Sequence, residues 1–271
     1  MCIQKSKPVR PKRRYLLAAA IFALGFALTF FAARGLVRNL RDNAAAQEEY
    51  AHLRSLSIVI ATVPRPAPAE PSVVPPESPT TEPEVYPDPD YSPALTPEQI
   101  AASLSIFAEI NPNFVGWITI AGTTVDYPIV RGPNNARYLN TTFSGASNPA
   151  GAIFMDYRCT GGFDAPVCII YGHNMRDGTM FSSLMNFLDR DFGYSEIIIV
   201  TADGEILVYH VFAVRRTDAW DSVYALDFND AKAASAFFGD EDTERFLVLS
   251  TCLTGADRHA RLLVFAALVE D

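Results

Sequence analysis

RFLVLSTC, residues 245–252, and RLLVFA, residues 261–266, are the two runs that decide the fold of this chain. In the first run apolar residues alternate between two faces, which is the periodicity of a β-strand. Residues 254–257, Thr-Gly-Ala-Asp, interrupt the pattern, so the first strand is predicted to end at Cys252. If the second run pairs with it in the antiparallel direction, Arg261 lies beside Cys252.

A thiol at a strand end beside a guanidinium suits nucleophilic catalysis. The cation favours the thiolate and can donate hydrogen bonds to a developing oxyanion. Arginine suits this task because it stays protonated and presents a planar fork of donors. The competing interpretation places Cys252 in the core, because free cysteines are among the most buried residues. These two residues alone leave both interpretations open.

Acidic residues predominate in the second part of the chain. Residues 94–271 hold eleven Lys and Arg against twenty-two Asp and Glu, whereas residues 1–93 hold eleven against nine. An acidic surface repels the phosphates of nucleic acid, so no nucleic-acid partner is expected.

The four cysteines include one pair with close spacing. Cys159 and Cys168 flank a short loop and could form a disulfide in an oxidising compartment. No cysteine spacing fits a zinc site, and nothing in the sequence requires a metal or an organic cofactor. We therefore expect neither.

The N-terminal segment predicts a membrane anchor. Residues 1–14 are rich in Lys and Arg, and residues 15–33 contain no charge. As a helix the second segment covers about 28 Å, close to the apolar thickness of a bilayer. The basic excess before it leaves the N-terminus cytoplasmic and the rest of the chain outside the cell. A cleaved signal peptide is the alternative, with residues 44–46, Ala-Ala-Ala, as the nearest cleavage site.

Two further segments precede the globular part. Residues 34–63 form a juxtamembrane segment, within which residues 35–61 predict a partly amphipathic helix. Residues 64–93 are rich in Pro, Glu, Ser and Thr and cannot bury enough apolar surface to fold, so they predict an extended linker. Such a linker reaches about 90 Å and would hold the following domain off a membrane.

Residues 94–271 predict one mainly β domain. A helix begins after Thr96, with Pro97 and Gln99 completing its capping signal, and ends at Asn111. Two short helical inserts are expected near residues 180–188 and 230–238. Strands are expected at residues 115–120, 125–130, 152–157, 167–171, 197–201 and 206–214. With the C-terminal pair these make eight strands, the number at which a small barrel fills its own interior.

His173 is the candidate proton carrier for the thiol. It follows an apolar strand, residues 167–171, so it projects from a strand end as Cys252 does. His259, in the loop before Arg261, stays an alternative. The remaining two histidines are interpreted as structural: His52 and His210.

Together these residues resemble the sortases, membrane-anchored cysteine transpeptidases of Gram-positive bacteria, and most closely their class B branch. The resemblance rests on residues 171–175, Tyr-Gly-His-Asn-Met, on residues 249–252, Leu-Ser-Thr-Cys, and on Arg261 at the start of the last strand. It extends over residues 97–271. One departure is Val248, where the family often has Thr. Further matches are residues 115–118 (VGWI), 126–130 (DYPIV), 135–139 (NARYL) and 151–156 (GAIFMD).

The resemblance implies an eight-stranded sortase barrel and a set of roles. Cys252 is the implied nucleophile, His173 the general acid and then base, and Arg261 the group that holds the substrate carbonyl or oxyanion. Arg258 is the alternative to Arg261. Three positions match residues that line the class B substrate groove: Asn135, Leu139 and Ser250.

Similar enzymes cut a sorting signal near the C-terminus of a secreted protein, hold the acyl group as a thioester and pass it to an amine. For this chain the expectation is cleavage after Thr and transfer to a cell-wall amine, with specificity depending on the insert near residues 218–240. The alternatives are a pilin-polymerising sortase that uses a lysine amine, and a cysteine protease in which water resolves the thioester. A further alternative is a non-catalytic membrane-tethered β-domain that binds wall or partner protein and buries Cys252.

Overall fold

The computed structural model describes residues 12–57, 96–188, 195–225, 230–239, 245–253 and 257–269, with the single residues 227, 243 and 255. The predicted linker and the first part of the predicted basic tail lie outside these residues. The chain divides into two units, residues 1–45 and 46–271. Each unit is described by itself.

The first unit contains most of helix α1, which spans Lys12–Leu56. From Ile21 onward this helix is long and apolar enough to cross a membrane, and it is the one such helix among the described residues. Its apolar side chains are exposed, for example Phe22 and Phe26 at 82% and 71%. Length and composition therefore support the predicted membrane anchor.

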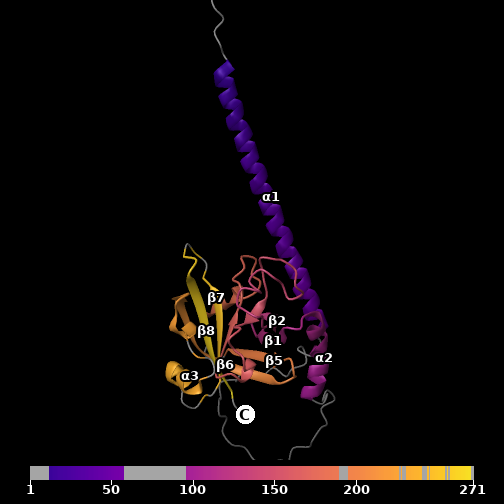
Figure 1. Cartoon of the computed structure of the whole chain (residues 1–271), viewed down its shortest axis with the longest axis vertical. Coiled ribbons are helices and arrows are strands. Elements are labelled where there is room, and N and C mark those ends of the chain that lie inside the picture. The colour runs from indigo at the N-terminus through magenta and orange to yellow at the C-terminus, as the bar shows by residue number, and fades with distance from the viewer. Residues whose placement is uncertain are drawn as a thin grey trace, which may run out of the picture. The chain divides into compact units, whose positions relative to one another are not determined.

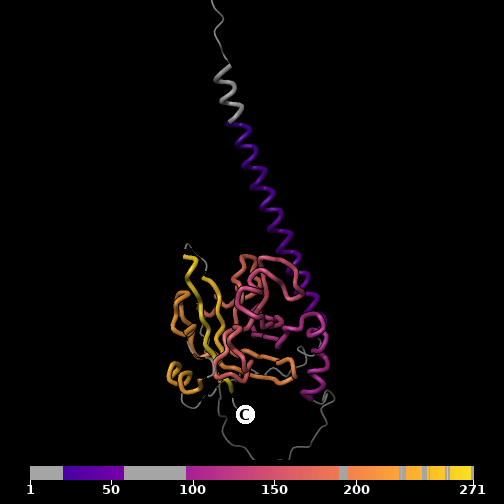
Figure 2. The backbone as a smooth tube through the Cα atoms, in the orientation of Figure 1, coloured from indigo at the N-terminus to yellow at the C-terminus, as the bar shows by residue number. Residues whose placement is uncertain are grey.

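Eight strands of the second unit close into a barrel, in the order β1-β2-β3-β4-β7-β8-β6-β5 (Figures 1 and 2). The prediction of an eight-stranded barrel is confirmed. The strands are β1 (Phe114–Ile120), β2 (Asp126–Val130), β3 (Ile153–Met155), β4 (Val167–Tyr171), β5 (Glu196–Thr201), β6 (Ile206–Asp218), β7 (Phe246–Cys252) and β8 (Ala260–Leu268).

Two strand pairings are parallel, β2 with β3 and β4 with β7. In the second of these, Tyr171 lies opposite Ser250. Parallel strands end at the same edge of a sheet, so the residues that follow β4 meet the end of β7. This pairing places the site described below.

Two strands differ in length from the sequence prediction by more than one residue. β6 runs to Asp218 rather than to residue 214, because its pairing with β8 extends from Tyr209 to Asp218, which lies opposite Ala260. β3 covers residues 153–155 rather than 152–157, because its pairing with β4 ends at Met155. The chain then turns at residues 157–158.

Helix α2 (Pro97–Ile110) lies against the β1–β2–β5 side of the barrel (Figure 1). Its predicted capping box is present, with Thr96 accepting from the backbone of Gln99 and the Gln99 side chain accepting from the backbone of Thr96. Its apolar face buries Phe107, whose ring centroid lies 5.1 Å from that of Trp117 in β1. Burying such side chains is the main favourable term that attaches the helix.

The predicted inserts are also present. Helix α3 (Ala231–Phe238) begins after Asp230, whose side chain accepts from the backbone of Ala233, and its Phe238 stacks 4.3 Å from Phe246 of β7. The insert near residues 180–188 is a 3₁₀ helix, η3 (Ser182–Leu188). Two further 3₁₀ turns are η2 (Gly162–Asp164) and η4 (Ser222–Ala225).

The last turns of α1 belong to the barrel unit. Ala46, Tyr50 and Leu53 are at most 4% exposed and join the same core cluster as the strands. The Tyr50 hydroxyl donates to the carbonyl of Gly151 at 2.6 Å, and its ring packs edge-on against Tyr127. Because this segment precedes the linker, the linker joins two parts of one unit. That the linker holds the domain off a membrane stays a prediction.

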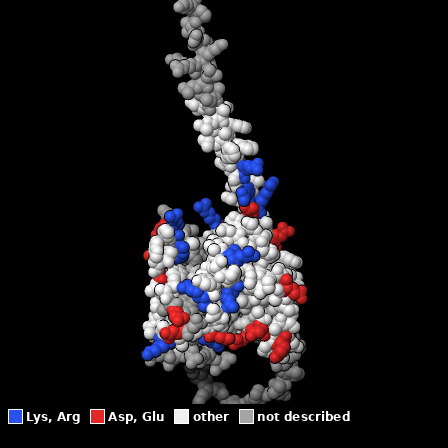
Figure 3. Space-filling view, in the orientation of Figure 1, with Lys and Arg blue, Asp and Glu red and all other residues white. Residues whose placement is uncertain are grey.

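Charge is unevenly spread over the barrel face seen in Figure 3. Basic side chains lie near the middle of that face, and acidic ones lie along its lower edge. The acidic excess of residues 94–271 is thus not uniform over the part of the surface in view.

Candidate active site

The site lies where β4 and β7 end side by side. Cys252 is the last residue of β7, and His173 follows β4 by two residues. The two strand ends are joined by hydrogen bonds from the Gly172 backbone to the Ser250 carbonyl at 3.2 Å and from Asn174 Nδ2 to the Cys252 carbonyl at 2.9 Å. Cys252 is exposed, so the interpretation that it is a buried core residue is wrong.

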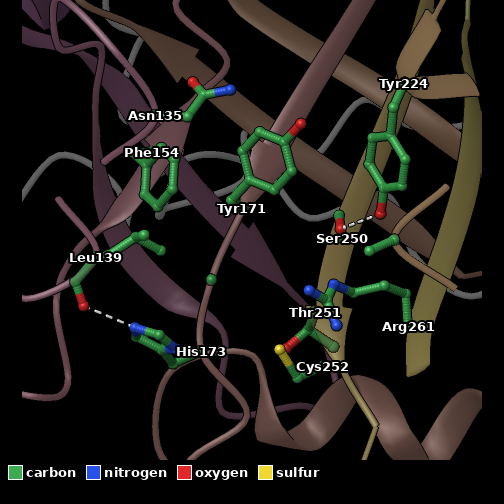
Figure 4. Close-up of a pocket in the computed structure, with 12 residues that line it drawn as sticks. Asn135, Leu139, Phe154, Tyr171, His173, Tyr224, Ser250, Thr251, Cys252 and Arg261 are labelled. Carbon is green, nitrogen blue, oxygen red and sulfur yellow. Dashed lines mark hydrogen bonds between the residues drawn. The ribbon is translucent and has the colours of Figure 1, made fainter. Parts of the chain in front are cut away.

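Arg261 lies directly opposite Cys252 in the antiparallel pairing of β7 with β8, as the sequence predicts. Its side chain reaches from β8 toward the strand end that carries Cys252 (Figure 4). Arg261 Nη1 donates to the carbonyls of Arg258 and Ala260, at 2.9 and 3.1 Å. A guanidinium has five N–H donors, so these two bonds leave others for a substrate oxygen. Arg261 lines the pocket described below and Arg258 does not.

His173 is held by a backbone carbonyl. Its Nε2 lies 2.7 Å from the carbonyl oxygen of Leu139 (Figure 4). A carbonyl oxygen only accepts, so Nε2 carries the hydrogen and Nδ1 is the nitrogen that can exchange a proton with a substrate. Asp257 is the acidic residue near Cys252 in the sequence. Its carboxylate accepts a hydrogen bond from the backbone N–H of His259 at 2.8 Å.

A pocket of about 330 Å³ gathers all six predicted site residues. The predicted catalytic set and the predicted substrate positions therefore lie together. The lining consists of Asn135, Leu139, Phe154, Tyr171, Gly172, His173, Ala219, Tyr224, Ser250, Thr251, Cys252 and Arg261.

The aromatic side of this pocket was not predicted from the sequence. Tyr224 comes from η4, within the insert that was expected to affect specificity, and its hydroxyl lies 2.8 Å from the Ser250 hydroxyl. Its ring stacks nearly parallel to that of Tyr171, with centroids 6.3 Å apart. Burial raises the pKa of Tyr224, so its hydroxyl stays protonated near neutral pH. Its position depends on a long connection, which residue spacing does not reveal.

Asp156 lies behind this aromatic side. Asp156 is 0% exposed, and burial alone would raise the pKa of its carboxyl group. Hydrogen bonds from Arg158, Asn135 and Tyr171 outweigh burial and hold that pKa below its usual value. Asp156 is therefore a buried carboxylate at neutral pH.

The two cysteines that could form a disulfide are free thiols in this structure. Cys159 and Cys168 are both buried, and burial raises the pKa of the Cys168 thiol well above its usual value. Neither lines the pocket that contains Cys252. Among the described residues, no group of three or more His, Cys, Asp and Glu side chains gathers as a metal site.

Known proteins are similar to this chain in sequence and in fold. A model of the sortase domain matches residues 118–269. Sortase B of Listeria monocytogenes is 34% identical over 188 residues, which cover 63% of this chain and 76% of that protein. The crystal structure of sortase B from Bacillus anthracis in complex with AAEK1 matches with a TM-score of 0.54 and 32% identity, covering 62% of this chain and 85% of that one.

A class B sortase of Streptococcus pyogenes involved in pilus biogenesis also matches, with a TM-score of 0.52 and 30% identity over 61% of this chain and 97% of that one. Both structural matches are to class B sortases, and the domain match covers the strands that carry the pocket. The chain therefore belongs to the sortase family, in its class B branch.

Proposed function

We propose that this sortase is a cysteine transpeptidase that cleaves a C-terminal sorting signal after Thr and transfers the acyl group to a cell-wall amine. The observation that carries the proposal is the shared edge of β4 and β7, which brings His173 to Cys252, while the β7–β8 register brings Arg261 to it. Transpeptidation is general in the family. The roles of the individual residues are our proposal.

In the first half-reaction the Cys252 thiolate attacks the carbonyl carbon of the Thr residue. The carbonyl electrons move onto oxygen, and Arg261 donates hydrogen bonds to that oxyanion. The carbon–nitrogen bond then breaks, and Nδ1 of imidazolium His173 gives its proton to the leaving amine. The product is a thioester on Cys252. The Leu139 carbonyl holds the imidazole in one orientation throughout, because it accepts from Nε2 in both protonation states.

In the second half-reaction an amine attacks the thioester carbon. Neutral His173 accepts the proton that the amine loses, the carbon–sulfur bond breaks, and the thiolate is regenerated. The two halves return every group to its starting state. Transfer to an amine rather than to water distinguishes this function from that of a cysteine protease.

Intact-mass spectrometry of the full chain in detergent micelles tests the proposal. We expect a panel of sorting-signal peptides to include one that adds an acyl group to Cys252, and a glycine-based amine to convert that adduct into a ligated peptide. Cys252→Ala should form no adduct. Ligation by that variant, or an adduct that only water resolves, would contradict the transpeptidase assignment.

The two candidate arginines provide a matched pair of variants. Arg261→Ala removes the donor that lies opposite Cys252 and should slow acylation by about a hundredfold or more. Arg258→Ala removes a side chain that does not line the pocket and should change the rate by less than about threefold. Equal losses in both variants would refute the assigned role of Arg261.

A second candidate acceptor is a lysine amine of a pilin. The observation that favours it is the match to a Streptococcus pyogenes class B sortase involved in pilus biogenesis. The same acyl-enzyme distinguishes the two acceptors, because a glycine-based amine and a peptide with an internal lysine can be offered in competition. Preferential ligation to the lysine would favour pilin polymerisation.

The same proposal includes the membrane arrangement. Residues 15–33 form the anchor, the N-terminus is cytoplasmic, and the barrel of residues 94–271 is extracellular. The apolar helix near the N-terminus supports an anchor, and the basic residues before it support this orientation. Protease added to intact cells should digest the barrel and leave an N-terminal tag intact. Digestion of the tag alone would contradict this orientation and indicate the opposite one.

A further inference from the structure

Asp156, just after β3, is a buried carboxylate whose two oxygens are fully used. Oδ1 accepts from the backbone N–H and the Nε–H of Arg158, both at 3.0 Å. Oδ2 accepts from Arg158 Nη2 at 2.8 Å, from Asn135 Nδ2 at 2.9 Å and from the Tyr171 hydroxyl at 2.9 Å. A buried charge is stable only when it is paired and hydrogen-bonded in this way.

The donors come from separate segments that surround the candidate active site. Asn135 belongs to the loop after β2, and Tyr171 ends β4. Arg158 extends the set to a third segment, because its Nη1 donates to the carbonyl of Tyr224 at 2.8 Å. Asn135, Tyr171 and Tyr224 all line the pocket, whereas Asp156 and Arg158 do not. The carboxylate thus connects three parts of the pocket wall without itself lining the pocket.

These contacts fix the shape of the wall. The Asn135 side chain is held at both ends, because its Oδ1 accepts from the backbone of Tyr157 while its Nδ2 donates to Asp156. The rings of Tyr171 and Tyr224 stack at an interplanar angle of 18°. Figure 4 shows Asn135 and the two rings side by side along the upper part of the pocket, away from His173 and Cys252.

We propose that Asp156 is a positioning residue for substrate binding, which holds Asn135, Tyr171 and, through Arg158, Tyr224 in the arrangement that receives the sorting-signal peptide. This proposal rests on the transpeptidase function proposed above. Because Asp156 is 0% exposed, it acts through these neighbours and not by touching substrate. Its loss should weaken peptide binding and leave the bond-breaking groups in place.

Asp156→Asn in the full chain tests the proposal. The new side chain has an NH2 group in place of one carboxylate oxygen. An NH2 group cannot accept, so the donors that bonded to that oxygen lose their acceptor. With the peptide that acylates the wild type fastest, we expect KM to rise about tenfold and kcat to change by less than about twofold. The rate at which iodoacetamide alkylates Cys252 should stay unchanged, because that small reagent does not need the wall. A fall in kcat with unchanged KM would overturn the proposal.

Two further variants make the test secure. Arg158→Lys keeps a positive charge but lacks the fork that meets both Asp156 and the Tyr224 carbonyl, so it should raise KM by about threefold to fivefold. If Asp156→Asn does not fold, Arg158→Lys takes its place as the test. An unchanged KM in Arg158→Lys would then overturn the proposal. The control is Asp164→Asn, which breaks the pair with Arg245 outside the pocket and should leave KM unchanged.

Hydrogen exchange followed by mass spectrometry separates this proposal from the proposed function. In Asp156→Asn, or in Arg158→Lys if that variant alone folds, peptides that cover residues 135–139 and 222–225 should exchange several times faster than in the wild type. This readout needs no substrate. If the wild type forms no acyl-enzyme but the exchange increases, the transpeptidase function fails and the network stands. Unchanged exchange at both segments would refute the network itself.

Discussion

Gly172→Ala is expected to destabilise the barrel and to displace His173, the next residue. A Cβ atom on Gly172 would lie 2.6 Å from Ile153 Cδ1 and 2.6 Å from both Cγ and Cδ2 of Phe181. Ordinary contacts begin near 3.4 Å, so each of these contacts is too short by about 0.8 Å. Ile153 and Phe181 are both 0% exposed and have no open space into which to move.

The displacement reaches the active site through the backbone. The Phe181 N–H donates to the carbonyl of His173 at 2.9 Å, so a shift of the Phe181 ring also moves the loop that carries His173. Inserting a methyl group into a packed core costs about 1–3 kcal/mol of unfolding free energy. At about 2 kcal/mol per M of urea, the unfolding midpoint should fall by about 0.5–1.5 M. A shift of His173 by about 1 Å should slow acylation by about a hundredfold.

Urea unfolding followed by tryptophan fluorescence and the rate of acyl-enzyme formation measure the two effects, since Trp117 is buried in the barrel. The matched control is Gly161→Ala, because the nearest atom would lie 3.4 Å from its new Cβ and its φ of −75° suits any residue. The control should stay within about 0.5 kcal/mol of the wild type. If Gly172→Ala matches the control in both assays, the packing argument is refuted.

Three further predictions concern groups buried away from the thiol. Tyr50→Phe removes the hydrogen bond to the Gly151 carbonyl and should lower the unfolding free energy by about 1–2 kcal/mol in urea titrations, which would also verify that residues 46–56 belong to the barrel unit. Because the pKa of Asp156 is lowered on folding, its charge stabilises the fold above the ordinary carboxyl pKa of about 4, and this contribution is lost as the pH falls through the folded value. The difference in urea midpoint between wild type and Asp156→Asn should accordingly be constant from about pH 7 to 5 and shrink below about pH 4. Iodoacetamide should modify exposed Cys252 in the folded chain and reach buried Cys168 only after unfolding, as peptide mapping would show; equal labelling would contradict the burial of Cys168.

The fold and most of the site could be predicted because local pattern and family motifs agree. Alternation over residues 246–252 predicted β7 and its end at Cys252, and the following loop predicted that Arg261 would lie opposite. The parallel pairing of β4 with β7 could not be derived from periodicity, because it depends on closure of the whole barrel. The place of His173 beside Cys252 therefore rested on the family resemblance. Tyr224 was missed because its long connection carries no periodic signal.

The placement of residues 46–56 could not be predicted for a different reason. Their apolar positions were interpreted as one amphipathic stripe of a juxtamembrane helix, and the pattern does not say what covers that stripe. The structure shows that the barrel covers it, at Ala46, Tyr50 and Leu53. The Pro-rich composition of residues 64–93 then suggested a boundary between anchor and domain. A compositional change marks where the chain cannot pack, not which flanking segments pack together.

Residues 46–56, which pack against the barrel, are connected through Tyr50 and Gly151 to the proposed proton carrier, His173. The Tyr50 hydroxyl bonds to the carbonyl of Gly151, and a Cβ on Gly151 would lie only 2.8 Å from the Leu139 carbonyl oxygen that holds His173. Gly151 also has a φ of +60°, so glycine suits this position by conformation as well as by space. The orientation of the imidazole thus depends on the Leu139 carbonyl, which lies close to Gly151, and Gly151 accepts a hydrogen bond from Tyr50 of the helix. Any change that releases residues 46–56 from the barrel should therefore alter proton transfer at His173 as well as stability.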